Sequence, residues 1–386
     1  MTSSDRGATR AAARRLHREL LQWLLASAYP LWAKRGYDHE RGGFHERLTA
    51  DGPVAADPRR ARVQVRQVYC FARGPTLGWQ ADPVPLITQG LEYFFARYRR
   101  PDGLFRTLCA ADGTPLDERA LLYDQAFVLL ALAESRKVLG PQPWLLAEAR
   151  ALMATITRRL KRAGPGFDSG LPERQPLLSN PHMHLLEAAL AWRATSDEPL
   201  WGALAADIVA LALEHLIEVR SGAVLERFGE DWAPSTDRLV EPGHLFEWAW
   251  LLLRSGTGGR SAAAALRLVA IGEEHGVHRG VAVNALAEDF SVHDGQARLW
   301  PQTERLKATA RLAVEDGRYW VAAAESAQAL LRYLTTAADG LWYDCLKVDG
   351  CFIEEPAPAS SFYHIVGAIA ELGSALTAEP DQVTRC

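Results

Sequence analysis

The chain has 386 residues and a formal net charge of −4, with 48% hydrophobic and 23% charged residues, the composition of an ordinary globular protein. No basic block indicates nucleic-acid binding, and the longest uncharged apolar run, Phe127 to Ala133, is too short to cross a bilayer. The five cysteines form no C-x-x-C pair, so they predict reduced thiols. We expect a cytoplasmic monomer or homodimer with no nucleic-acid or membrane partner.

A glycine-turn motif recurs along the chain. Residues 42–52, 102–113 and 339–350 each read as a glycine turn, a short alternating strand and an Asp-Gly turn into a second strand. Weaker copies begin at three more glycines, which gives the six markers Gly43, Gly103, Gly166, Gly222, Gly280 and Gly340. The steps between them are 60, 63, 56, 58 and 60 residues. A regular step of this size is typical of a repeat architecture.

The sequence between the markers is helical in pattern. Apolar residues fall at 3.6-residue spacing, as at Ile87, Leu91, Phe94 and Tyr98. Each interval holds two helices, and six helical hairpins bury their apolar faces only by stacking side by side. Closure into a ring leaves no exposed end. The sequence therefore predicts an all-α (α/α)6 barrel with short β-hairpins on one rim, as a single catalytic domain over residues 1–386 with flexible ends at 1–12 and 380–386.

Polar residues lie inside two apolar runs in the first half of the chain. Arg66 is surrounded by Val63, Val65 and Val68, so a buried Arg66 needs a polar partner. Tyr123 and Asp124 stand at the start of a helix in the same way. Both segments are candidates for a site rather than for simple core.

Three later helices begin alike, with proline at the first helical position. Their first turns carry Asn180 with His184, His244 with Glu247, and Trp300 with Glu304. On inner helices, these side chains would converge on one rim of the barrel. A helix N-terminus disfavours imidazolium, so we expect the histidines to be neutral and able to accept a proton.

A metal or cofactor is not expected. His182 and His184 are two residues apart on a helix, so they point in different directions. No H-E-x-x-H motif and no glycine-rich nucleotide loop is present.

The chain resembles the N-acylglucosamine 2-epimerase superfamily, which also contains mannose isomerases, cellobiose 2-epimerases and sulfoquinovose isomerase. The resemblance covers roughly residues 20 to 375 and is carried, in the family's order, by R-x-x-x-R-Q-V-Y (62–69), L-Y-D-Q-A-F (122–127), N-P-H-M-H-L-L-E-A (180–188), P-G-H-L-F-E-W-A-W-L-L (242–252), W-P-Q-T-E (300–304) and Y-H-I (363–365). It implies an (α/α)6 barrel and metal-independent proton transfer at C1–C2 of a sugar.

The resemblance also implies residue roles. His244 and His364 become the acid/base pair, Arg66 holds the carbonyl or enediol oxygen, and Glu247 orients His244. We expect the monosaccharide to be contacted by Asn180, His184, Tyr123, Asp124, Trp300 and Glu304. Ser360 stands where some relatives carry glutamine, which makes a sulfosugar substrate less favoured.

Overall likeness favours an isomerase that interconverts free D-mannose and D-fructose through a cis-enediol. A sugar 2-epimerase remains the alternative, because both histidines are present. A remote alternative is a glycoside hydrolase that uses two of Asp124, Glu247 and Glu304. A non-catalytic sugar-binding or partner-binding ring is a further reading.

Overall fold

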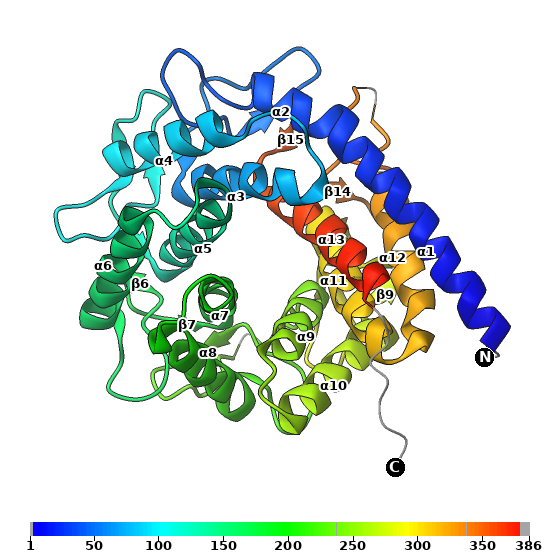
Figure 1. The fold of residues 1–386 in the computed structure, drawn as a ribbon. Helices are drawn as coiled ribbons and strands as arrows, with labels where there is room; N and C mark the ends of the chain where they lie inside the picture. The colour runs from blue at the N-terminus through cyan, green and yellow to red at the C-terminus, as the bar shows by residue number, and fades with distance from the viewer. Residues whose placement is uncertain (1–2, 237, 337, 379–386) are drawn as a thin grey trace.

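Two concentric layers of helices form a closed ring (Figure 1) in the computed structural model, which describes residues 3–236, 238–336 and 338–378. The inner helices are α3 (Ala61–Leu77), α5 (Leu122–Leu139), α7 (Ser179–Arg193), α9 (Pro242–Ser255), α11 (Leu299–Glu315) and α13 (Ser360–Thr377). Each packs on the next, and α13 packs on α3. The predicted (α/α)6 barrel is therefore confirmed.

The outer layer consists of the helices that alternate with the inner ones along the chain. They are α1 (Ser3–Trp23) with its continuations η1 (Leu24–Ala28) and α2 (Tyr29–Arg35), α4 (Val84–Tyr98), α6 (Pro143–Leu160), α8 (Pro199–Leu211) with η2 (Ala212–Leu216), α10 (Gly259–His275), and η3 (Gly317–Tyr319) leading into α12 (Trp320–Tyr333). Helix α1 packs against both α12 and α13, which joins the two ends of the chain. Residues 3–12, expected as part of a flexible end, belong to α1, whereas 379–386 lie outside the described residues.

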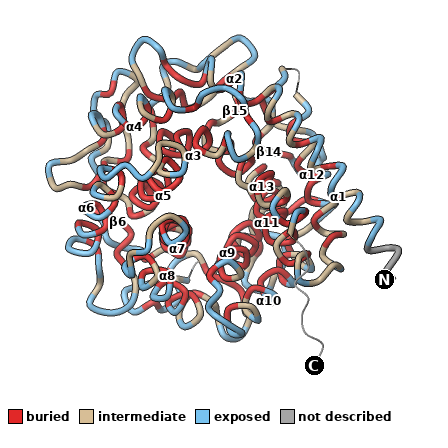
Figure 2. The backbone as a smooth tube through the Cα atoms, viewed as in Figure 1, coloured by how far each residue is buried: buried red, intermediate tan, exposed pale blue. Residues whose placement is uncertain are grey.

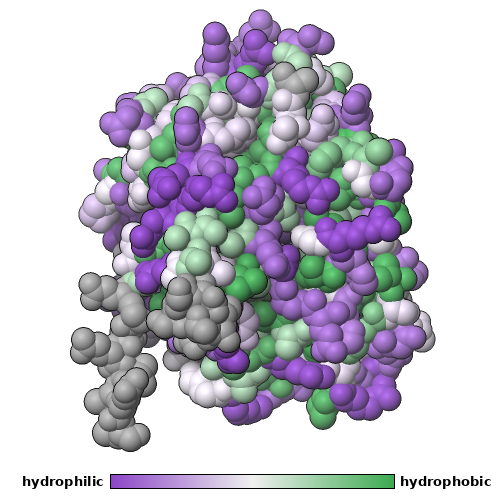
Figure 3. Space-filling model, turned by 90° about the vertical axis from the view of Figure 1, so that its right-hand side faces the viewer, coloured by the Kyte–Doolittle hydropathy of each residue, from purple (hydrophilic) through white to green (hydrophobic). Residues whose placement is uncertain are grey.

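Burial follows the two layers. The inner helices are buried almost throughout, and the outer helices alternate between buried and exposed residues (Figure 2). On the face that carries α1 and α12, hydrophobic residues form small patches among hydrophilic ones (Figure 3). One stretch, Pro199–Leu216, is long and apolar enough to cross a membrane, but it forms α8 and η2 and packs against α7 as an outer helix. A buried outer helix of a barrel passes the same test of length and composition.

The strands connect neighbouring repeats. The strand before an inner helix pairs with a strand of the following repeat in β2 (Arg59–Arg60) with β3 (Leu108–Cys109), β5 (Ala120–Leu121) with β6 (Gly170–Leu171), β7 (Leu177–Leu178) with β8 (Arg227–Phe228), β13 (Ala297–Arg298) with β14 (Cys345–Leu346), and β15 (Ala357–Pro358) with β1 (Arg47–Leu48). Local hairpins also occur, at β3 with β4 (Pro115–Asp117), β9 (Val277–His278) with β10 (Val281–Ala282), and β11 (Ala285–Leu286) with β12 (Val292–Asp294). Sequence spacing revealed hairpins but not pairing between repeats.

All six glycine markers have the same backbone conformation. Their φ angles lie between +76° and +88°, at Gly43, Gly103, Gly166, Gly222, Gly280 and Gly340. A positive φ favours glycine because it has no Cβ. At Gly340 a Cβ would also come within 2.7 Å of the Ser27 carbonyl oxygen. The six-fold repeat, including its three weak copies, is confirmed.

A buried amide ties each of three glycine turns to the inner helix that follows it. Gln125 accepts from the Phe105 N–H and donates to its carbonyl, both at 2.9 Å. The pairs Gln64 with Phe44 and Gln302 with Ala282 repeat this arrangement at the same separation of 20 residues. In the third repeat His182 Nε2 accepts from the Phe167 N–H at 2.9 Å. His182 is therefore a structural residue.

Candidate active site

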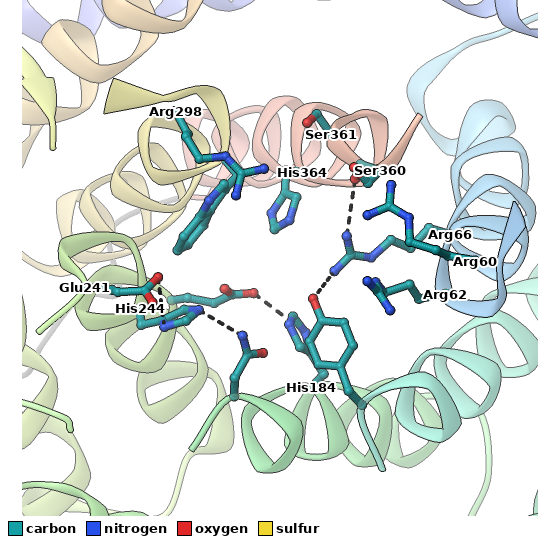
Figure 4. A pocket seen from close by; sticks show the side chains of 14 residues that line it. Arg60, Arg62, Arg66, His184, Glu241, His244, Arg298, Ser360, Ser361 and His364 are labelled. Carbon is teal, nitrogen blue, oxygen red and sulfur yellow. Dashed lines mark hydrogen bonds and ion pairs between the residues drawn. The ribbon is translucent and has the colours of Figure 1, made fainter. Parts of the chain in front are cut away.

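The six inner helices open onto one cavity of about 310 Å³ at the rim that carries the strands (Figure 4). Each helix contributes one residue at or next to its start: Arg62, Tyr123, Asn180, Glu241, Trp300 and Ser360. These positions are separated by 57 to 61 residues, so the cavity repeats the period of the fold. Arg66, His184 and His364 lie one helical turn deeper, four residues after Arg62, Asn180 and Ser360.

His364 is a neutral base in this arrangement. Its Nδ1 lies 2.8 Å from Glu304 Oε1, so a Nδ1–H donated to Glu304 leaves the Nε2 lone pair free. Burial, followed by the cations of Arg66 and Lys307, holds the pKa of His364 well below its ordinary value. The side chain points into the cavity (Figure 4).

His244 carries the opposite charge. Burial by itself lowers its pKa, but the carboxylates of Glu226 and Glu241 outweigh burial and raise the pKa to about 10. Glu226 Oε2 lies 2.9 Å from His244 Nδ1, and Glu241 Oε2 lies 3.5 Å from it. The prediction that His244 is neutral is therefore wrong, because two carboxylates outweigh the helix N-terminus.

Asn180 is the partner of the second ring nitrogen of His244. Its side-chain amide lies 3.1 Å from His244 Nε2. A doubly protonated imidazole needs an acceptor at this position, and the amide supplies one when its oxygen faces the ring. Trp300 lies against both catalytic histidines, with its ring centroid 4.9 Å from that of His244 and 5.8 Å from that of His364.

His184 is held by carboxylates below the cavity. Its Nδ1 lies 3.4 Å from Glu187 Oε2, which also accepts a short hydrogen bond from the Tyr363 hydroxyl. Burial lowers the pKa of His184 to about 4, so this ring is neutral as expected. His182 and His184 do diverge, since His182 turns to the glycine loop and His184 to the cavity.

Glu247 lines the cavity, but its closest recorded partner is not His244. Its Oε1 lies 3.8 Å from His184 Nδ1, and both of its oxygens are buried without a hydrogen bond to a described residue. Burial and the nearby Glu304 raise the pKa of Glu247 well above its ordinary value. The prediction that Glu247 orients His244 is corrected: Glu226 and Glu241 hold that ring.

Arg66 is a buried cation facing the cavity with no carboxylate partner among the described residues. Its Nη2 donates to the Tyr123 hydroxyl at 2.6 Å and its Nη1 to the Ser360 carbonyl at 3.4 Å. The guanidinium also lies over the Phe127 ring, 4.0 Å from the centroid. These neutral partners leave its positive charge uncompensated, which suits an anionic or oxygen-rich ligand.

Two residues expected to contact substrate lie behind the cavity wall. Asp124 is fully buried, accepts from the Thr107 hydroxyl, and lies 3.3 Å from Arg62 Nη1. Glu304 is fully buried and faces His364. Both are correctly placed at the site but support residues that line it. The other eight expected residues all line the cavity.

Lys307 is a charged residue that sequence analysis did not single out. Its side chain is buried, its Nζ lies 2.6 Å from Glu304 Oε2, and it stands 3.6 Å from the Trp250 ring centroid. Its spacing of three residues from Glu304 on a helix was the available signal. Glu226 was missed too, because it reaches His244 from a loop rather than from an inner helix.

Three groups of side chains have atoms close enough to share a cation. They are His184 with Glu187 and Glu247, Glu226 with Glu241 and His244, and Glu247 with Glu304 and His364. Each already contains a protein donor: Tyr363 bonds Glu187, His244 faces Glu226, and Lys307 pairs with Glu304. The positive charges in these clusters are thus supplied by lysine and imidazolium.

Comparisons with known proteins agree with this site. The family model for N-acylglucosamine 2-epimerase (GlcNAc 2-epimerase) matches residues 42–368. The chain is 46% identical over 374 residues to a mannose-6-phosphate isomerase of Rhizobium meliloti (strain 1021), covering 93% of this chain and 97% of that one. It is 30% identical over 188 residues to a D-mannose isomerase of Thermobifida fusca, covering 44% and 46%.

A solved structure shows the same fold. Cellobiose 2-epimerase from Spirochaeta thermophila DSM 6192 superposes with a TM-score of 0.87 at 21% identity, over 95% of this chain and 98% of that chain. The family model covers most of the chain, from the first glycine turn into α13. The chain belongs to the N-acylglucosamine 2-epimerase family.

Proposed function

We propose that the chain is an aldose–ketose isomerase that interconverts mannose and fructose. Support comes from the two relatives named as mannose or mannose-6-phosphate isomerases and from the charge states in the cavity. In the open-chain aldose, the C2 hydrogen is acidified by the C1 carbonyl. A base that removes it and returns it to C1 produces the ketose.

The cavity supplies the groups for this step. His364 Nε2 takes the proton from C2, and its Nδ1–H stays bonded to Glu304. Arg66 stabilises the enediolate oxygen by charge-assisted hydrogen bonds. His244, as an imidazolium, donates a proton to the sugar oxygens during ring opening and moves the hydroxyl proton of the enediol. His364 then delivers its proton to C1.

The asymmetry of the two histidines is the observation that favours isomerisation over 2-epimerisation. Epimerisation needs a base on each face of C2, whereas isomerisation needs one base. The pKa of His364 is lowered well below its ordinary value and that of His244 is raised to about 10. At neutral pH, one of the two can accept a carbon-bound proton and the other cannot.

The hydrolase alternative is less well supported. Hydrolysis needs two carboxyl groups on opposite sides of the glycosidic bond. Of its three candidates, Asp124 and Glu304 lie behind the wall and Glu247 alone lines the cavity.

Fructose formation from mannose tests the proposal. His364→Asn should lower kcat by about 10²- to 10⁴-fold, the usual cost of losing a general base, while circular dichroism shows an unchanged fold. His45→Asn, at a buried histidine that does not line the cavity, is the matched control. Wild-type protein that makes no fructose, or His364→Asn with full activity, would contradict the proposal.

A phosphorylated hexose is a second candidate substrate, favoured by three more arginines in the same cavity. Arg60 pairs with Glu46 at 2.7 Å, Arg62 with Asp124 at 3.3 Å, and Arg298 with Asp344 at 3.3 Å. Together with Arg66 they make the wall strongly cationic, and guanidinium groups bind phosphate well. The R. meliloti relative carries mannose 6-phosphate in its name.

The ratio of kcat/KM for mannose 6-phosphate to that for mannose decides between the two substrates. If the phosphate binds to these arginines, the ratio exceeds ten, Arg62→Leu lowers it at least tenfold, and inorganic phosphate competes with the sugar phosphate. A ratio below one without competition by phosphate would leave free mannose as the substrate.

We also propose that catalysis needs no metal ion, because the clusters suited to a cation hold Lys307 and His244 instead. Exhaustive treatment with a chelator should leave kcat unchanged. Activity lost on chelation and restored by a divalent ion would contradict this.

A further inference from the structure

A chain of three charged or polar groups runs from the cavity into the barrel interior. His364 Nδ1 lies 2.8 Å from Glu304 Oε1, and Glu304 Oε2 lies 2.6 Å from Lys307 Nζ. The Lys307 side chain is 2% exposed and that of Glu304 is fully buried. A lysine in such a place has lost its hydration, so its position depends on the carboxylates around it.

We propose that Lys307 is a positioning residue for the reaction: its ammonium keeps Glu304 ionised, and ionised Glu304 fixes the tautomer of His364 that leaves Nε2 free to accept the substrate proton. The inference rests on the proposed function for its kinetic test. Its structural part, the tautomer of His364, does not depend on any substrate.

The surroundings of Glu304 explain why it needs a cation. Burial raises the pKa of its carboxyl group, and Lys307 opposes this effect. The neighbouring groups that bear or share charge come from the other inner helices: Glu187 and His184 on α7, Glu247 on α9, Tyr363 and His364 on α13, and Arg66 on α3. Three carboxyl groups around one ammonium make Lys307 the cation nearest to Glu304.

Loss of this cation changes the hydrogen bond at His364. A neutral Glu304 carries a proton that it can donate to His364 Nδ1. The imidazole would then hold its own proton on Nε2 and could not accept one from C2. The second ring nitrogen thus decides whether the catalytic nitrogen is a base, as in other carboxylate–histidine pairs.

Lys307→Met tests the inference because methionine keeps the length and removes the charge. We expect kcat to fall at least tenfold with KM within twofold, and the acid limb of the kcat profile to move to higher pH, since Glu304 then becomes ionised only at higher pH. The ¹⁵N signal of His364, assigned with His364→Asn, should shift toward a protonated Nε2. Lys347→Met, at a half-exposed lysine outside the site, is the control and should change none of these values.

A folded Lys307→Met protein with wild-type kcat and an unchanged His364 signal would overturn the inference. If Lys307→Met does not fold, Lys307→Met in the Glu304→Gln background replaces it, because both charges are then removed together. Lys307 acting through Glu304 predicts less than a twofold further change in kcat in that background. A further tenfold loss would show that Lys307 acts by another route. Wild-type protein inactive on every hexose would instead contradict the proposed function, and the ¹⁵N signal would still decide the tautomer.

Discussion

His244 and His364 face one cavity, yet their carboxylate partners give them opposite charges. Glu226 and Glu241 approach His244 directly and make it a cation. Glu304 also faces a histidine, but Lys307 neutralises its charge, and His364 stays neutral. The same pair of residue types therefore produces an acid on one wall and a base on the other. The difference comes from the neighbouring lysine.

The pH dependence of kcat follows from these charges. Activity requires His364 in its neutral form and His244 in its protonated form. Since burial and Arg66 lower the pKa of His364 and the carboxylates raise that of His244 to about 10, kcat should be flat through neutral pH and fall as the pH rises through about 10. Glu226→Gln removes one anion, so the alkaline limb should move to lower pH.

Glu230→Gln is the matched control, since Glu230 lies in the same loop and does not line the cavity. Its pH profile should equal that of the wild type. An alkaline limb that stays in place in Glu226→Gln would show that His244 is not the group that titrates there.

The site residues that could be predicted from sequence are those whose spacing follows the helices. Arg66, His184 and His364 each stand in an early turn of an inner helix, and a motif or a proline marks that turn. Glu226 could not be found this way, because a loop brings it to His244 from 18 residues earlier in the chain. The partners of His244 are thus set by tertiary packing rather than by helical period.

At the scale of elements, each inner helix is fixed by a polar contact to the glycine turn before it. The buried amides of Gln64, Gln125 and Gln302 bond both backbone groups of a turn residue 20 positions earlier. These contacts orient the first helical turns, which carry the cavity side chains. Helix positions and the hairpins were predictable from local pattern. The strand pairs between repeats were not, because their partners are far apart in sequence.

Gln125→Leu should destabilise the fold while keeping the shape of the side chain. The Phe105 N–H and carbonyl would be buried without partners, which costs about 1–3 kcal/mol for each group. We expect the free energy of unfolding to fall by about 2–4 kcal/mol in urea denaturation. Gln80→Leu, at an exposed glutamine, should have little effect. Equal stabilities of the two variants would show that the amide contact does not fix the helix.

At the scale of the whole molecule, the ring has no free end. Strand β1 pairs with β15, and α1 packs on α12 and α13, so the first and last repeats depend on each other. We propose that residues 1–386 form a single catalytic domain on this basis. A closed ring cannot lose one hairpin without exposing the apolar faces of its two neighbours.

Unfolding should therefore occur in one transition. Far-ultraviolet circular dichroism and tryptophan fluorescence are expected to give the same midpoint in urea, since the tryptophans are spread over several helices. Two separated transitions, or a stable fragment after limited proteolysis, would indicate independent domains.

The site of deuterium incorporation tests the central claim most directly. Mannose incubated with the enzyme in deuterated water is analysed by NMR, and mannose 6-phosphate is treated in parallel. Proton transfer from C2 to C1 by His364 predicts the ketose as product, with solvent deuterium at C1, and no label with His364→Asn. Deuterium at C2 of glucose, without any ketose, would contradict isomerisation and establish 2-epimerisation instead.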